Sequence, residues 1–146
     1  MNGMESKKTA ASVICALVMF AWIGAARLTQ AAEFVTLPNG EEVMDIRGNW
    51  DAEFENYGPW SQYGSYPGTI EIILDGNTFV GKRLTATKYH AADTECFRCE
   101  LDSSGITKLQ LMTRLGPIEA KGQLGNDGKR LTFDDGEKTR STMTKQ

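Results

Sequence analysis

Hydrophobic and polar side chains alternate at every second position over much of the sequence from residue 46 onward. In the first such run, from Ile46 to Glu55, apolar or small residues alternate with charged or polar ones, and Trp50 lies on the apolar face. Because successive side chains of a β-strand point to opposite faces, this run predicts a strand with one buried and one solvated face. Further strands are expected at 70–74, 78–89, 96–101, 109–115, 118–124, 131–133 and 138–145.

Turn sequences rich in glycine separate these predicted strands. Asp75-Gly76-Asn77 and the stretch from Gly125 to Gly128 are typical of tight hairpins, since Gly and Asn accept the positive φ angles that such turns need. No segment after residue 32 shows the 3.6-residue period of an amphipathic helix. About eight short strands joined by turns predict an all-β domain, folded as an antiparallel up-and-down barrel or as a sandwich.

The barrel is the architecture that we favour, because the apolar faces mix small and large side chains. Gly48 and Ala52 alternate with large aromatic residues on the first strand, and small residues let strands coil tightly and leave room inside. An eight-stranded barrel encloses an interior just wide enough for packed side chains or one small ligand, and its closure removes exposed sheet edges. We assign residues 46–146 to this single domain and residues 33–45 to a polar lead-in with a turn at Pro38-Asn39-Gly40.

The segment Gly48-Asn49-Trp50 resembles the Gly-x-Trp signature on the first strand of lipocalin and avidin-like barrels. The resemblance implies a lipocalin-like barrel in which Gly48 is structural and Trp50 closes one end. In these families a basic residue on the last strand often packs over the tryptophan, and Arg140 would be that residue here. The sequence departs from lipocalins in its short length and in lacking both their Thr-Asp-Tyr turn and a C-terminal helix pattern.

The N-terminal segment, residues 1–32, has the pattern of a secretory signal peptide. Lys7 and Lys8 precede an uncharged, largely apolar stretch at 9–26, and small residues occupy the first and third positions before a cut after Ala31. A charged start, an apolar middle and a small-residue cleavage site are the usual secretory arrangement. The apolar stretch also approaches the roughly 18 to 20 residues that span a bilayer, so an uncleaved membrane anchor is the alternative. If the signal peptide is cleaved, we expect a periplasmic or secreted protein that no longer associates with the membrane.

Removal of the signal peptide would make the chain more acidic. Residues 32–146 keep 13 of the 16 basic and 18 of the 19 acidic residues, which gives a formal charge of −5. No basic patch stands out in this part of the sequence, so nucleic acid and anionic membrane surfaces are poor partners. About 115 residues are enough for one domain with a real but modest core.

Four aromatic residues gather in the Gly- and Pro-rich segment 57–67, between the first two predicted strands. They are Tyr57, Trp60, Tyr63 and Tyr66. Because Pro lacks a backbone donor and Gly loosens the path of the chain, we expect this segment to be a loop at one mouth of the barrel. Rigid amphipathic rings beside Ser and Gly are typical of recognition surfaces. The rings either contact an apolar ligand, a sugar or a partner protein, or fold back to cover the end of the barrel.

Two cysteines, Cys96 and Cys99, lie three residues apart in one predicted strand. An oxidising compartment favours a disulfide between them, but residues at this spacing on an extended strand are about 10 Å apart at Cα, and a disulfide needs less than about 7 Å. We predict the disulfide, which requires a local turn. His90, the only histidine, could join these thiols at a metal, but the four-ligand spacing of a structural zinc site is lacking, and we predict no metal.

Catalytic patterns are weak in this sequence. With a single histidine, the sequence offers few possibilities for a Ser-His-Asp or Cys-His catalytic arrangement. It contains no glycine-rich loop of a phosphate-binding site, and it implies no cofactor. We therefore expect no enzyme but an exported binding protein, whose ligand is a small, largely apolar molecule in the barrel or at its mouth. The alternative is a protein–protein interaction module, an inhibitor or accessory subunit, that docks through the aromatic loop 57–67. A barrel interior filled by aromatic side chains, with no pocket, would favour the alternative.

Overall fold

The first alternating run forms strand β3 (Gly48–Asn56) in the computed structural model, which describes residues 31–146. The even-numbered side chains from Trp50 to Phe54 are buried, and the odd-numbered ones between them are exposed. The burial pattern therefore matches the faces that the alternation predicts. The expected signal peptide at 1–32 lies outside the described residues, except for its last two positions.

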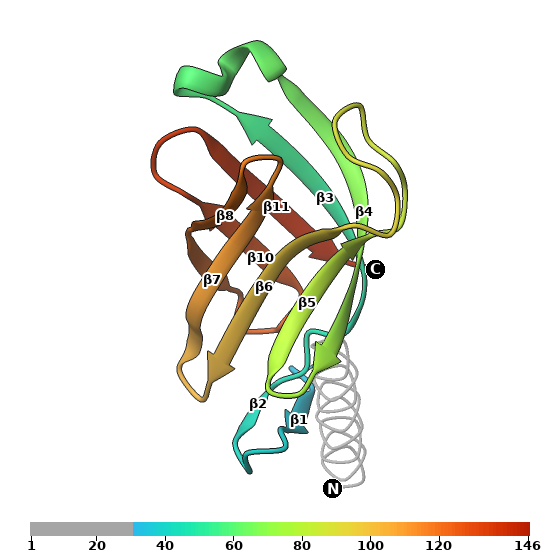
Figure 1. The fold of residues 1–146 in the computed structure, drawn as a ribbon. Coiled ribbons are helices and arrows are strands. Elements are labelled where there is room, and N and C mark those ends of the chain that lie inside the picture. Colours follow the sequence, from blue (N-terminus) through green and yellow to red (C-terminus); the bar gives the residue numbers. More distant parts are fainter. Residues whose placement is uncertain (1–30) are drawn as a thin grey trace, which may run out of the picture. The chain divides into compact units, whose positions relative to one another are not determined.

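Nine strands form one antiparallel sheet that is nearly closed on itself (Figure 1). The order of the strands is β8-β7-β6-β5-β4-β3-β11-β10-β9. Apart from β8 and β9, strands of this sheet that follow each other in sequence are neighbours, and the last strand, β11, pairs with β3. This arrangement confirms the predicted all-β, antiparallel barrel. The strands other than β3 are β4 (Ser65–Asp75), β5 (Thr78–Arg83), β6 (Glu95–Asp102), β7 (Gly105–Thr113), β8 (Gly116–Glu119), β9 (Lys121–Leu124), β10 (Arg130–Asp134) and β11 (Thr139–Lys145).

The two edge strands, β8 and β9, are separated in sequence by Ala120 alone. β8 pairs with β7, β9 pairs with β10, and the Ala120 N–H donates a hydrogen bond to the Leu109 carbonyl of β7 at 3.1 Å. β9 also packs against β7, because a Cβ at Gly122 would lie 2.8 Å from a methyl carbon of Ile106. Residues 116–124 thus act as one bent strand, as the alternating pattern predicts, and bring the two edges of the sheet together.

The segment 33–45, expected as a polar lead-in, forms a hairpin of its own. Strands β1 (Phe34–Thr36) and β2 (Glu42–Met44) pair antiparallel across the predicted turn. Three apolar residues of this segment and its exit are almost fully buried: Leu37, Val43 and Ile46. The Asn39 N–H donates to the Asn77 side-chain oxygen at 3.1 Å, which places the hairpin tip against the β4–β5 turn. The hairpin therefore covers one end of the barrel (Figure 1).

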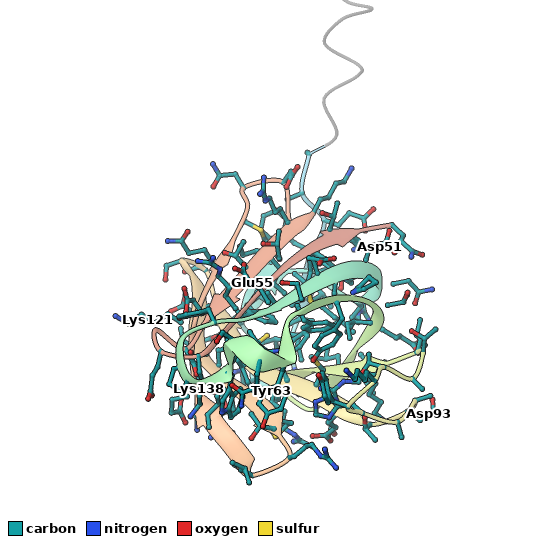
Figure 2. The ribbon with its side chains drawn as sticks, turned by 90° about the horizontal axis from the view of Figure 1, so that it is seen from above. Asp51, Glu55, Tyr63, Asp93, Lys121 and Lys138 are labelled. Carbon is teal, nitrogen blue, oxygen red and sulfur yellow. The ribbon has the colours of Figure 1, made fainter. Side chains whose placement is uncertain are left out.

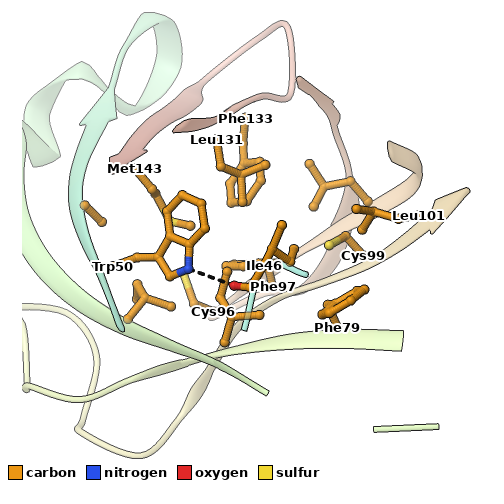
Figure 3. Packing of buried hydrophobic residues seen from close by; sticks show 14 of the residues in the cluster. Ile46, Trp50, Phe79, Cys96, Phe97, Cys99, Leu101, Leu131, Phe133 and Met143 are labelled. Carbon is orange, nitrogen blue, oxygen red and sulfur yellow. Dashed lines mark hydrogen bonds between the residues drawn. The ribbon is translucent and has the colours of Figure 1, made fainter. Parts of the chain in front are cut away.

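Trp50 belongs to a core of buried apolar side chains next to this hairpin (Figure 3). Its side chain is 0% exposed, and its indole N–H donates to the Ile46 carbonyl at 2.9 Å. Phe97 packs edge-to-face against Phe133, with ring centroids 4.7 Å apart. A Cβ at Gly81 would lie only 2.1 Å from the Phe97 ring. The large rings fit because a residue without a side chain lies opposite them.

The expected packing of Arg140 over Trp50 is wrong. The strand register places Trp50 opposite Lys145 and Arg140 opposite Glu55. Arg140 Nε and Nη2 donate to the Glu55 carboxylate at 2.6 and 2.7 Å, on exposed side chains. The register of β11 against β3 decides this contact, and it is a property of the folded sheet rather than of either strand. Gly48 has a φ of +126°, a conformation that favours glycine, which fits its expected structural role.

The predicted Cys96–Cys99 disulfide is absent, and both thiols are free and buried. β6 remains extended through this segment, so the local turn that a disulfide requires does not form. A register shift in the β5–β6 pairing lets adjacent residues Cys96 and Phe97 both be buried, and the two cysteines occupy separate places in the core (Figure 3). Burial raises the pKa of Cys96 to about 11 and that of Cys99 to about 12. Both thiols are therefore protonated and inert at neutral pH.

Candidate functional site

The end of the barrel away from the β1–β2 hairpin holds a cavity of about 350 Å³, which we call the mouth cavity. Its rim comes from the ends of β3, β7 and β11, from the short helix η1 (Gly58–Tyr63) and from the segment 84–94 that joins β5 to β6. Figure 2 looks down on this end and shows Tyr63 and Lys138 on the side of η1. The aromatic segment therefore lies at the mouth of the barrel.

Proline and glycine shape the aromatic segment locally. Pro59 lies in the first turn of η1, a 3-10 helix, where a backbone donor is not needed, and Gly64 follows the helix with a φ of +65°. β4 begins directly afterwards, so Tyr66 and Pro67 belong to a strand rather than to the expected loop.

Within residues 31–146, no helix is long and apolar enough to cross a bilayer.

Four aromatic rings form a connected wall on one side of the cavity, which we call the aromatic wall. Its members are Trp60, Tyr63, Tyr66 and Tyr89. The ring centroids of Tyr63 and Tyr66 lie 5.4 and 5.8 Å from that of Tyr89. The Tyr89 hydroxyl also donates to the Tyr63 carbonyl at 3.2 Å. The segment 84–94 is thereby tied to the end of η1, and the two segments present one surface to the cavity.

Three of the four predicted ligand contacts line the mouth cavity: Trp60, Tyr63 and Tyr66. Tyr57 is not among the lining residues, because its hydroxyl turns away and donates to Asp134 Oδ1 at 2.5 Å. This hydrogen bond is the main reason why the pKa of Tyr57 rises to about 12. The guanidinium of Arg140 lies 5.2 Å from the centre of the same ring. Tyr57 therefore attaches the start of η1 to the neighbouring β10–β11 turn.

The rings partly cover the barrel end and partly remain accessible. Tyr63 is 43% exposed, whereas Trp60 is half-buried, with Lys138 Nζ 4.8 Å above its ring. Tyr66 is also half-buried, and burial raises the pKa of its hydroxyl. Leu115, at the β7–β8 turn, also lines the cavity and is 88% exposed. The two sequence-based alternatives, a contact surface and a cover, both describe part of this arrangement.

Two buried polar groups in the lining have unpartnered atoms. Arg83 is 5% exposed, and its Nη1 donates to the Thr94 hydroxyl at 3.2 Å and to the Glu95 carbonyl at 2.7 Å. Its Nε has no hydrogen-bond partner within residues 31–146, and neither does Oγ of Ser141, a residue that is 6% exposed. Buried polar groups are nearly always hydrogen-bonded, so two unsatisfied groups at one cavity are unusual.

Sequence reasoning missed Arg83, Ser141 and Tyr89. The alternation in β5 could have pointed to Arg83, because Phe79, Gly81 and Arg83 occupy every second position of this strand and all three are buried. Tyr89 stood at the end of an expected strand, which in the structure ends at residue 83 and is followed by a loop. A basic side chain at an inward position of a strand is the feature that would have identified the site.

His90 also lines the cavity. Its pKa is lowered to about 4, chiefly because burial disfavours the charged ring, and the positive charges of Arg83 and Arg114 add to the effect. The imidazole is therefore neutral at pH 7.

With respect to metals, no group of three or more His, Cys, Asp or Glu side chains in the described part of the chain is placed to bind an ion.

Comparison of the chain with protein-family models, with curated proteins and with solved structures gave no match.

Proposed function

We propose that this chain is an exported, non-catalytic binding protein that holds a small, largely apolar ligand in the mouth cavity. The observation that carries the proposal is the cavity itself. Its volume of about 350 Å³ falls within the roughly 300–1,000 Å³ of typical small-molecule sites. Aromatic and aliphatic side chains make up much of its lining, including Phe54, Leu111 and Phe133 beneath the aromatic wall.

The titratable groups of the cavity support binding rather than catalysis. The thiol of Cys96 is protonated at neutral pH because burial raises its pKa to about 11. Among the residues that the structure describes, no Asp or Glu in the lining could orient His90 as a general base. What the cavity offers a ligand is apolar surface and aromatic rings with a few polar groups, which is the usual composition of a binding pocket.

Trp60→Ala and Tyr63→Ala should each weaken binding of a small apolar ligand by roughly thirtyfold, since aromatic anchors contribute about 2 kcal/mol or more. The melting temperature should stay nearly unchanged, because neither ring is fully buried. Titration with the neutral fluorescent probe N-phenyl-naphthylamine measures the affinity. Phe34→Ala, which removes an exposed ring from β1 at the other end of the barrel, is the matched control and should bind normally.

The opposite result would contradict the assignment of the site. A clear loss of thermal stability with unchanged probe affinity would mean that the aromatic segment is a structural cover and that the ligand binds elsewhere.

Export is the second part of the proposal and rests on the pattern of residues 1–32. When the full chain is expressed in a cell with a secretion pathway, N-terminal sequencing of the exported protein should start at Ala32 or Glu33. Full-length chain in the membrane fraction would show that the segment is an uncleaved anchor instead.

Docking of a partner protein through the aromatic loop is the second candidate function. The observation in its favour is the exposure of two large side chains on the same rim, Tyr63 at 43% and Leu115 at 88%. Apolar residues exposed together on a soluble protein often mark a contact surface. Failure of every small apolar probe to enter the mouth cavity would favour this candidate over the first.

A further inference from the structure

Arg83 is a buried cation that has no acidic partner within the described residues. Its side chain lines the mouth cavity at 5% exposure, and its two hydrogen bonds, both from Nη1, go to neutral oxygens of Thr94 and Glu95. Three other arginines of residues 31–146 do form ion pairs with carboxylates: Arg47, Arg98 and Arg140. Because buried charges are costly unless they are paired, an uncompensated guanidinium beside a cavity suggests that its counter-charge comes from a ligand.

The charge of the cavity lining is opposite to that of the chain. Among the described residues, three arginines line the mouth cavity, Arg83, Arg114 and Arg140, of which Arg140 is paired with Glu55, and no Asp or Glu lines it. Yet residues 32–146 as a whole carry a formal charge of −5. Positive charge gathered at the entrance of a cavity attracts anions and repels cations.

Ser141 adds a second polar group from another strand. It lies on β11, opposite Phe54 of β3, and its unpartnered hydroxyl lines the same cavity as Arg83. Phe54 in turn packs against Tyr66 of the aromatic wall, with ring centroids 5.3 Å apart. The cavity thus combines a large apolar surface with two polar side chains, one of them charged, that each have an atom unpartnered within the described residues.

We propose that the ligand is an amphipathic anion, whose apolar body lies against the aromatic wall and whose carboxylate is held by Arg83 and Ser141. This inference rests on the proposed function, because it assigns a head group to the ligand of the same cavity. A carboxylate accepts hydrogen bonds from both side chains and neutralises the guanidinium, whose planar set of donors matches carboxylate geometry.

Three compounds with the same decyl chain test the head group: decanoate, decanol and decylamine. Each competes at neutral pH with bound N-phenyl-naphthylamine, at concentrations below those at which micelles form. We expect decanoate to bind about tenfold more tightly than decanol, because charge-assisted hydrogen bonds form only with the anion. Decylamine should bind most weakly, since its ammonium would lie beside arginines.

The possible failures separate the two proposals. Equal affinity for decanoate and decanol would overturn the carboxylate inference while leaving the apolar binding function intact. If neither the naphthylamine nor any decyl compound binds, both proposals fall.

Arg83→Met and Ser141→Ala test where the head group lies. Arg83→Met removes the charge while keeping an apolar chain, and should abolish the preference for decanoate over decanol without preventing naphthylamine binding. Ser141→Ala is a smaller change, and should lower the preference about threefold. Arg98→Met is the matched control, because Arg98 is a partly exposed arginine that is paired with Glu95 and does not line the cavity. A full decanoate preference in Arg83→Met, or in Ser141→Ala if Arg83→Met does not fold, would overturn the inference.

Discussion

Trp50→Ala is expected to lower the free energy of unfolding by about 3–5 kcal/mol, the usual range for a large aromatic side chain removed from a core. The side chain is 0% exposed and packs in the buried cluster beside the β1–β2 hairpin. Its removal leaves a cavity and deprives the Ile46 carbonyl of the indole donor at 2.9 Å. Because Ile46 directly follows the hairpin, the substitution should also loosen the cover of this barrel end. Denaturant unfolding followed by circular dichroism measures the change.

Two other tryptophan substitutions serve as controls for this result. Trp50→Phe keeps an aromatic ring but removes the N–H donor, and should cost less than the alanine variant. Trp60→Ala removes a half-buried ring at the other end of the barrel and should cost under about 1 kcal/mol. A loss under about 1 kcal/mol for Trp50→Ala itself would contradict the central place of this residue in the core.

Gly81→Val should destabilise the protein by about 3 kcal/mol, at the upper end of the range for overpacked cores. A Cβ at this position would lie 2.1 Å from one Phe97 ring carbon and 2.6 Å from two others. The ring cannot easily move aside, because Phe97 is 0% exposed and packs on Phe133. Denaturant unfolding measures the loss, and Lys82→Val, at the next position of the same strand, should be nearly neutral.

A double-mutant cycle shows whether the clash is the cause. If the valine collides with the ring, Gly81→Val should cost at least about 1 kcal/mol less in a Phe97→Leu background than in the parent. Equal costs in the two backgrounds would mean that the glycine is needed for backbone conformation and not for space.

Local patterns along the chain were enough to identify the fold class. Period-two alternation depends only on the geometry of an extended chain, so the buried face of β3 and the place of Trp50 on it could be predicted without knowing any partner strand. Turn sequences such as Asp75-Gly76-Asn77 likewise depend on the φ angles of a few residues, and the structure has Gly76 at φ +62°. These features also predicted the aromatic segment at a mouth of the barrel.

Long-range contacts were beyond these local patterns. The hairpin at 34–44 has strands of only three residues, too short to show a period, and its Leu37 and Val43 are buried because they pack against the core at the barrel end. The disulfide prediction failed because β6 pairs on both sides and stays extended. Arg140 faces Glu55 because of the β3–β11 register.

The candidate site shows the same division between sequence and tertiary structure. The sequence by itself determined that the chain forms an antiparallel barrel of alternating strands with Trp50 inside and aromatic rings at one end. Only the tertiary structure decided that the mouth keeps a cavity, that Tyr89 completes the aromatic wall, and that Arg83 and Ser141 both line this cavity, each with one atom unpartnered within the described residues. The physical reason is that alternation specifies the face of each side chain, whereas closure and register of the sheet specify which inward side chains come together.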